Sequence, residues 1–295
     1  MNDPNVPRSN EDVLSERARE LIERAEREAE REAEQDRQEG PASREPLFSG
    51  LLLFLLDFRA LLRWGILTLF AVGLTTIFEQ FLQYMAGGLI NQVFAIALGM
   101  LMGPLTLLYL TVTAVCGLVI LQDTANGWAK IQQWPGRNIA DWMFDAFYVL
   151  NPLWLAALPG VLLGQLPVLM GIAGQGLAVL GGMLSAWVLF PLFSLCVVEA
   201  GSPLSMWSQA IFRQFRSHRA QVKSFYLVSA GLVLAGLLAL YFLARSWFPV
   251  RVFGAAGLNL VVMVYFRLLG RLAGLMDDPS IPEVSPADAT DSEQP

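Results

Sequence analysis

Residues 93–121 read "VFAIALGMLMGPLTLLYLTVTAVCGLVIL", and this run decides the fold class of the chain. It contains no charged residue and is long enough to cross about 30 Å of hydrocarbon at a helical rise of 1.5 Å per residue. A run of this length is too long for a strand and too uniformly apolar for the surface helix of a soluble domain. It therefore predicts a transmembrane helix.

Working outward from this run, five more segments have the same character. The chain of 295 residues is 55% hydrophobic and only 16% charged, whereas soluble domains carry about 25% charged residues. The apolar segments are continuous and rich in Leu, Ala and Gly, while the strands of a membrane barrel alternate and are shorter. We therefore predict an all-α, polytopic membrane protein with six transmembrane helices. The predicted spans are 64–86, 93–121, 147–170, 175–198, 224–244 and 252–272.

The acidic residues lie mostly in the two tails of the chain. Residues 1–45 hold 14 of the 26 acids and residues 277–295 hold six more, whereas residues 46–276 have 12 Lys and Arg against six Asp and Glu. We expect a charged, partly helical or disordered N-terminal tail over 1–45, with an oligomerisation coil as the alternative. The spans occupy 46–276, and a disordered, acidic, Pro-rich tail occupies 277–295. The polar N-terminal tail is unlike a cleavable signal, so the first span itself should direct insertion.

The basic residues of the connections predict the orientation of the chain. Ten Lys and Arg fall in the segments on the N-terminal side of the membrane and only two fall on the opposite side. The excess marks the cytoplasmic side, so we expect a multi-pass protein of a bacterial cytoplasmic (inner) membrane with both termini in the cytoplasm. The ten are Arg59, Arg63, Lys130, Arg137, Arg213, Arg216, Arg219, Lys223, Arg267 and Arg271, and the two are Arg245 and Arg251.

Each of the three predicted hairpins follows a segment that resembles a cytoplasmic interfacial helix. These segments are 46–64, 138–150 and 207–225. In the second, Asn138 and Asp141 have the spacing of a capping box. One interpretation is three units, each an interfacial helix plus a helical hairpin. The other is that amphipathic residues gather at the inner interface of any polytopic protein.

The third segment, "WSQAIFRQFRSHRAQVKSF" (207–225), carries aromatic and basic residues together. As one helix, it would place Trp207 with the apolar residues on one side and the basic residues on another. We expect an interfacial helix on anionic lipid headgroups, with partner docking as the alternative and nucleic acid disfavoured. Trp128 and Trp134, in the preceding cytoplasmic connection, suit the membrane interface or a partner in the same way. The candidate residues in 207–225 are Trp207, Arg213, Arg216, Arg219 and Lys223.

The sequence offers little for catalysis. The one histidine, His218, lies among arginines, and the two cysteines, Cys116 and Cys196, fall within apolar runs. A Ser or Cys nucleophile would require a nearby His base, and a zinc site requires more His and Cys ligands than these. We therefore predict no catalytic residues, no metal, no cofactor and no enzymatic activity, and treat His218 as a bystander.

Two polar residues within the predicted spans are candidates for a functional role. Glu79 lies near the outer end of the first span and Asn259 lies near the middle of the sixth. Polar groups are costly in hydrocarbon, so each marks a functional site by default. The alternatives are interfacial placement for Glu79 and a hydrogen bond between helices for Asn259.

Two resemblances bear on function. The segment 123–160, "DTANGWAKIQQWPGRNIADWMFDAFYVLNPLWLAALPG", resembles a segment of uncharacterised polytopic membrane proteins of planctomycete-type bacteria. The whole resemblance covers about residues 50–275. That resemblance implies a fold and a location but no activity. The matching positions are Asp123, Thr124, Ala125, Gly127, Trp134, Pro135, Asp141 and Trp142, and residues 199–215 are also similar.

The second resemblance is to the permease subunits of ATP-driven importers. Glu199-Ala200-Gly201 begins like their cytoplasmic coupling helix, but the later Gly and the Ile-x-Leu-Pro ending are missing. We expect a non-enzymatic scaffold or subunit of a membrane assembly, with a cytoplasmic protein partner or a second copy bound. The alternative is a permease-like subunit that uses 203–223 as a coupling helix. Transport would require a polar cavity lined by Glu79, Asn259 or Gln165.

Overall fold

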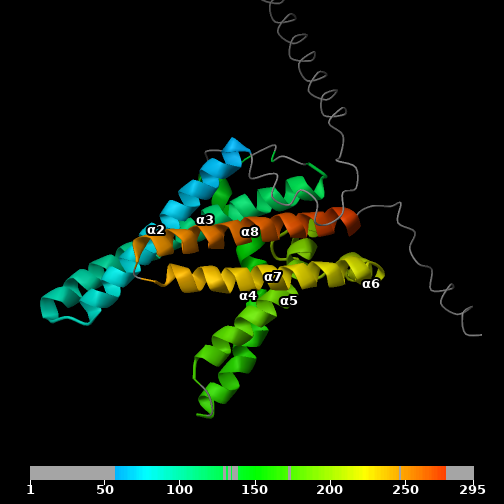
Figure 1. Cartoon of the computed structure of the whole chain (residues 1–295). Coiled ribbons are helices and arrows are strands. Elements are labelled where there is room, and N and C mark those ends of the chain that lie inside the picture. Colours follow the sequence, from blue (N-terminus) through cyan, green and yellow to red (C-terminus); the bar gives the residue numbers. More distant parts are fainter. Residues whose placement is uncertain are drawn as a thin grey trace, which may run out of the picture. The chain divides into compact units, whose positions relative to one another are not determined.

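The computed structural model describes residues 57–128, 131, 134, 139–171, 174–245 and 247–276, and within them all regular structure is helical (Figure 1). Six of the helices are long and apolar enough to cross a membrane, and α6 is the short exception. The predicted all-α, six-span fold is therefore confirmed, while both tails lie outside the described residues. The helices are α2 (Phe58–Met85), α3 (Leu89–Ala125), α4 (Ile139–Leu169), α5 (Gly176–Ala200), α6 (Gln209–Ser217), α7 (Arg219–Leu243) and α8 (Phe248–Met276).

The described parts of the first two expected interfacial segments are the first turns of spans rather than separate helices. The Asp57 side chain accepts the backbone N–H of Arg59 at 3.1 Å and caps α2, which then runs unbroken to Met85. Residues 46–56 lie outside the described residues. Helix α4 likewise begins at residue 139 and continues past 150, because residues 139–151 contain no Gly or Pro. Within the residues that the structure describes, the third segment alone contains a separate short helix, α6.

The hairpin expected within 147–198 is present. Helix α4 ends at Leu169 and α5 begins at Gly176, so the two spans are joined by a short connection. Pro152, Pro159 and Pro167 lie inside α4 without ending it. Proline is tolerated in membrane helices because neighbouring helices and local adjustments satisfy the freed carbonyls. The prolines are therefore no guide to where this span ends.

Helix α8 is the centre of the bundle. It packs against α2, α3 and α7 (Figure 1). The α4–α5 hairpin joins the bundle through the packing of α4 on α3 and through α5, because Phe190 stacks on Tyr265 of α8 and Trp187 donates to the Ser229 hydroxyl of α7 at 3.0 Å. Leu268, Leu269 and Leu272 of α8 are fully buried, together with Leu121 of α3 and Phe225 of α7. Many large apolar side chains on the outer faces of the spans remain exposed, as a lipid-facing surface requires.

A small-residue pair on α8 brings that helix against α3. A β-carbon added at Gly270 would lie 2.5 Å from the carbonyl oxygen of Leu121, and one added at Gly274 would lie 2.8 Å from that of Ala125. Such contacts are closer than real β-carbons make, so only glycine fits. The Gly-x-x-x-Gly spacing therefore serves close packing between two spans of one chain.

We expect Gly270→Val to separate α8 from α3 and to lower the free energy of unfolding by about 1–3 kcal/mol, since overpacking forces backbone shifts of that cost. Gly231→Val is the matched control, because Gly231 on α7 has open space around its α-carbon. Unfolding of both variants in a denaturing-detergent titration measures the difference. Equal midpoints for the two variants would contradict this account of the α3–α8 contact.

Candidate functional site

The connection between α5 and α6 is fixed to α4. Gly201 ends α5 with a left-handed backbone (φ 59°, ψ 20°), a conformation that favours glycine. The Tyr148 hydroxyl donates to the carbonyl oxygen of Gly201 at 2.8 Å, and the Asn151 amide donates to that of Pro203 at 2.7 Å. Two side chains of α4 thus hold the chain before it enters α6, so α6 starts from a defined position.

Helix α6 has one packed side and one exposed side. The Ser208 hydroxyl oxygen accepts the backbone N–H of Ile211 at 3.4 Å and caps the helix. Ile211 is buried, and Phe215 is half-buried against the same core. Arg213 and Arg216 are exposed on the other side. The amphipathic pattern predicted for this segment is therefore present in the helix.

His218 divides the segment that we expected to be a single helix. With φ −96° and ψ 39°, His218 leaves the helical conformation, ends α6 and precedes the first residue of α7. Its Nδ1 lies 3.1 Å from the carbonyl oxygen of Gln214 and 3.0 Å from the Ser217 hydroxyl. The single-helix prediction is thus wrong. The His218 ring has a structural contact with the carbonyl end of α6, where α6 and α7 meet. That His218 takes no part in catalysis stays a prediction.

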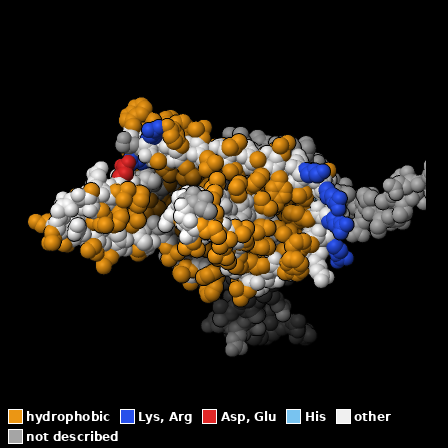
Figure 2. Space-filling view, turned by 90° about the horizontal axis from the view of Figure 1, so that it is seen from below, with side chains coloured by type: hydrophobic (Ala, Val, Ile, Leu, Met, Phe, Trp, Pro, Cys, Tyr) orange, Lys and Arg blue, Asp and Glu red, His pale blue; other side chains and the backbone are white. Residues whose placement is uncertain are grey.

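The basic residues of both helices form an exposed row that we call the cationic edge: Arg213, Arg216, Arg219 and Lys223. Figure 2 shows Lys and Arg side chains gathered at the end of the molecule where α6 lies, beside a broad apolar surface. Trp207 departs from the expected pattern, because it precedes α6 and is 69% exposed. Its ring lies on that of Phe212, with the ring centroids 4.2 Å apart.

The connection between α3 and α4 contains Trp128 and Trp134, which are half-buried, unlike the exposed Trp207. Trp128 is half-buried directly after α3, and its backbone N–H donates to the carbonyl oxygen of Asp123 at 2.9 Å. Trp134 is half-buried against the core, and the Arg63 guanidinium lies 4.5 Å from the centre of its ring. Arg63 and Trp134 therefore tie α2 to this connection through a cation–π contact.

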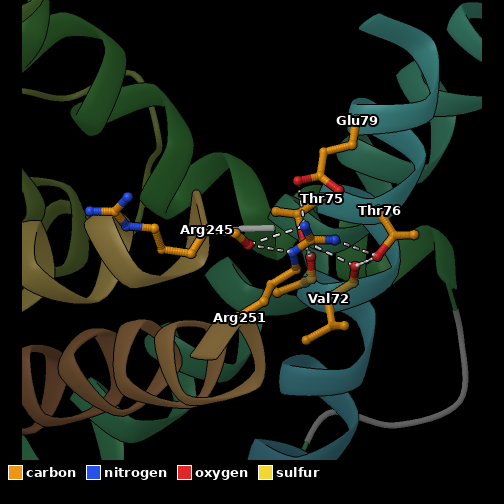
Figure 3. A network of polar contacts seen from close by, with 7 residues as sticks. Val72, Thr75, Thr76, Glu79, Arg245 and Arg251 are labelled. Carbon is orange, nitrogen blue, oxygen red and sulfur yellow. Dashed lines mark hydrogen bonds and ion pairs between the residues drawn. The ribbon is translucent and has the colours of Figure 1, made fainter. Parts of the chain in front are cut away.

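Glu79 belongs to a polar network at the opposite end of α7 from the cationic edge. The Arg251 guanidinium donates to the carbonyl oxygen of Arg245 from Nε at 3.2 Å and from Nη2 at 3.1 Å. It also donates to the Thr76 hydroxyl at 3.1 Å and forms an ion pair with Glu79 (Figure 3). Arg251 is only 3% exposed. A guanidinium buried to this extent is stable only because its donors and its charge are matched.

The network joins α2 to the α7–α8 connection. Thr76 completes it by donating to the Val72 carbonyl oxygen at 2.8 Å while it accepts from Arg251. The Arg245 side chain points away (Figure 3), and its guanidinium lies 4.3 Å from the centre of the Tyr241 ring. Sequence reasoning treated Arg251 only as a charge in an outer connection. The sequence indicated only that an acid, Glu79, and a base, Arg251, lie on the same predicted side of the membrane.

Asn259 makes a hydrogen bond between two helices. The Tyr109 hydroxyl of α3 donates to Asn259 Oδ1 at 2.7 Å, and the Asn259 amide donates to the carbonyl oxygen of Ala255 at 3.1 Å. Asn259 is 1% exposed. The sequence offered no reason to select Tyr109, because the apolar runs contain many other hydroxyl side chains. This pair cross-links α8 and α3 inside the bundle.

The described residues offer little for metal or thiol chemistry. Among them, no group of three or more His, Cys, Asp or Glu side chains is placed to hold a metal ion. Cys116 and Cys196 are both buried and free. The fold and these polar links define a multi-pass, helical integral membrane protein. No protein-family model, no curated protein and no solved structure matches the chain.

We expect Glu79→Gln to lower the free energy of unfolding by about 1–2 kcal/mol, because it removes the counter-charge of the buried Arg251 guanidinium. This expected loss lies toward the low end of the losses seen when one partner of a charged pair is removed, because the Glu79 side chain is 35% exposed. Glu199→Gln, at the exposed end of α5, is the charge-matched control. If both variants unfold at the same detergent concentration, the ion pair does not join α2 to α8.

A double-mutant cycle of Tyr109→Phe and Asn259→Leu tests the link between α3 and α8. We expect a coupling energy of about 1 kcal/mol, in the range measured for hydrogen bonds between membrane helices. Tyr241→Phe combined with Asn259→Leu should instead be additive, since Tyr241 is 54% exposed on α7. Additivity in the first cycle would show that the Tyr109–Asn259 bond does not stabilise the bundle.

Proposed function

We propose that this chain is a non-enzymatic scaffold, or a subunit of a membrane assembly, in a bacterial inner membrane. The observation that carries the proposal is the enclosure of Asn259. Its side chain is almost fully buried and hydrogen-bonded to Tyr109 and Ala255, so this polar group of the sixth span is used to hold helices together. A route for a solute would require such groups to face an open space.

The position of Glu79 supports the same conclusion. It is paired with Arg251, which precedes Asn259 by eight residues on α8, a separation of roughly 12 Å along the helix. The two candidate polar groups therefore lie at different levels of the bundle. Each is bonded to a different part of the chain, and each acts as a link between elements.

The distribution of charge supports a cytoplasmic location for both termini. The cationic edge is exposed at the start of α7, whereas Arg251 follows the other end of that helix and is paired with Glu79. Exposed positive charge is therefore concentrated on the side that also holds the N-terminus of α2. The positive-inside rule assigns that side to the cytoplasm. Residues 1–45 and 277–295 would then be available to cytoplasmic partners or to a second copy.

A permease-like subunit is the second candidate, and one observation favours it. Helix α6 is a separate short helix between two spans, as a coupling helix would be, and it lies within the expected segment 203–223. The departures of this segment from the importer pattern count against it. The two candidates differ in the partner that α6 would contact, which is an ATPase for the permease.

Photo-crosslinking in living cells tests the scaffold role. A photoreactive residue at Leu14 or Leu21 should give discrete protein adducts, while one at Leu227, which is 78% exposed on α7, should give lipid adducts only. Deleting residues 1–45 should move the crosslinked partner into a smaller complex, because a scaffold holds its partners together. An ATPase crosslinked to position 216 would overturn the scaffold in favour of the permease.

A further inference from the structure

The cationic edge is a fixed feature of the fold rather than a set of charges on a loose loop. Its first two residues stand on α6, whose entry is held by Tyr148 and Asn151 and whose inner side is anchored by Ile211. Its last two stand on the first turns of α7. The backbone that carries all four cations is thus positioned before any ligand arrives, which lowers the entropy cost of binding.

The charge of the edge is not neutralised within its own segment. Residues 201–225 contain four Lys and Arg and no Asp or Glu, and the closest acid in the sequence is Glu199 at the end of α5. Arg213 and Arg216 are three residues apart on α6, and Arg219 and Lys223 are four residues apart on α7, so each pair projects from neighbouring positions on its own helix. All four are exposed. The edge is therefore complementary to a row of negative charges.

The apolar residues beside the cationic edge indicate what kind of ligand carries the complementary negative charges. Leu204 and Trp207, in the connection before α6, are 82% and 69% exposed, and Trp207 lies against Phe212. Figure 2 shows the basic row bordering the apolar surface of the spans. An exposed Leu and Trp beside cations is the pattern of a helix at the boundary between lipid headgroups and acyl chains. A soluble acidic protein would not require the adjoining lipid-facing surface.

We propose that the cationic edge binds the phosphate groups of anionic phospholipids in the inner leaflet, with Leu204 and Trp207 entering the headgroup region. The break at His218 fits this role, since it separates the short α6, whose Arg213 and Arg216 are exposed, from α7, which is long and apolar enough to cross a membrane. The attraction comes from exposed guanidinium and ammonium groups near a phosphate surface. The proposal does not rest on the scaffold role, but a permease that placed α6 against an ATPase would exclude it.

Native mass spectrometry of the full chain in detergent tests the proposal. The probes are phosphatidylglycerol and phosphatidylcholine with identical acyl chains. We expect the wild-type chain to retain phosphatidylglycerol preferentially. Arg213→Gln with Arg216→Gln should weaken its binding by at least about tenfold, since each lost charge accounts for about a fivefold change. Phosphatidylcholine binding should not change. Both arginines are exposed, so the double variant should keep its fold, which its size-exclusion profile checks.

Two controls separate charge from other effects. Arg213→Lys with Arg216→Lys keeps the charge and should retain the affinity for phosphatidylglycerol to within about twofold. Arg245→Gln removes a charge at the other end of α7 and should leave that affinity unchanged. The proposal is overturned if the double Gln variant binds phosphatidylglycerol like the wild type, or if the Lys variant loses as much affinity. A protein adduct in place of a lipid adduct at position 216 in cells would also overturn it.

Discussion

The packing of α8 against α2, α3 and α7 is the interaction on which the rest of the bundle depends. Lipid chains are as apolar as leucine, so membrane helices associate through close packing and interhelical hydrogen bonds rather than through the hydrophobic effect. Helix α8 provides both, with Gly270 against the backbone of α3 and Asn259 bonded to Tyr109. The α4–α5 hairpin is attached to the same centre, because α4 packs on α3 and Phe190 of α5 stacks on Tyr265 of α8.

The spans were predictable from the sequence because hydrocarbon imposes a length and an apolar composition that each run satisfies by itself. The residues at which the helices begin and end were less predictable. Helix α2 begins at the Asp57 cap and α4 continues from residue 139 into its span, since the sequence change from amphipathic to apolar does not break a helix. The break at His218 was missed for a related reason. The periodicity of 207–225 suits one helix, and the break comes from a local conformation at a single residue.

The polar links were beyond the reach of sequence reasoning because they join residues far apart in the chain. Arg251 and Glu79 are both visible as charges, but which element faces which follows only from the packing of α2 on α8. A count of basic residues gives Arg251 and Arg213 the same weight. In the folded chain, Arg251 is buried and paired while Arg213 is exposed. Burial thus separates these two residues in a way that the count does not, while Arg245, at the same end as Arg251, remains exposed.

Two polar residues of α8, Arg251 and Asn259, hold this helix in place because their side chains face different neighbouring helices. Arg251 reaches Thr76 and Glu79 on α2, and Asn259 reaches Tyr109 on α3. Eight residues at 3.6 per turn place their side chains about 80° apart around the helix axis. The two contacts together fix the rotation of α8, because a turn that improved one would break the other. A conduit would instead require polar groups at successive levels to face one common space, whereas Arg251 and Asn259 face different helices.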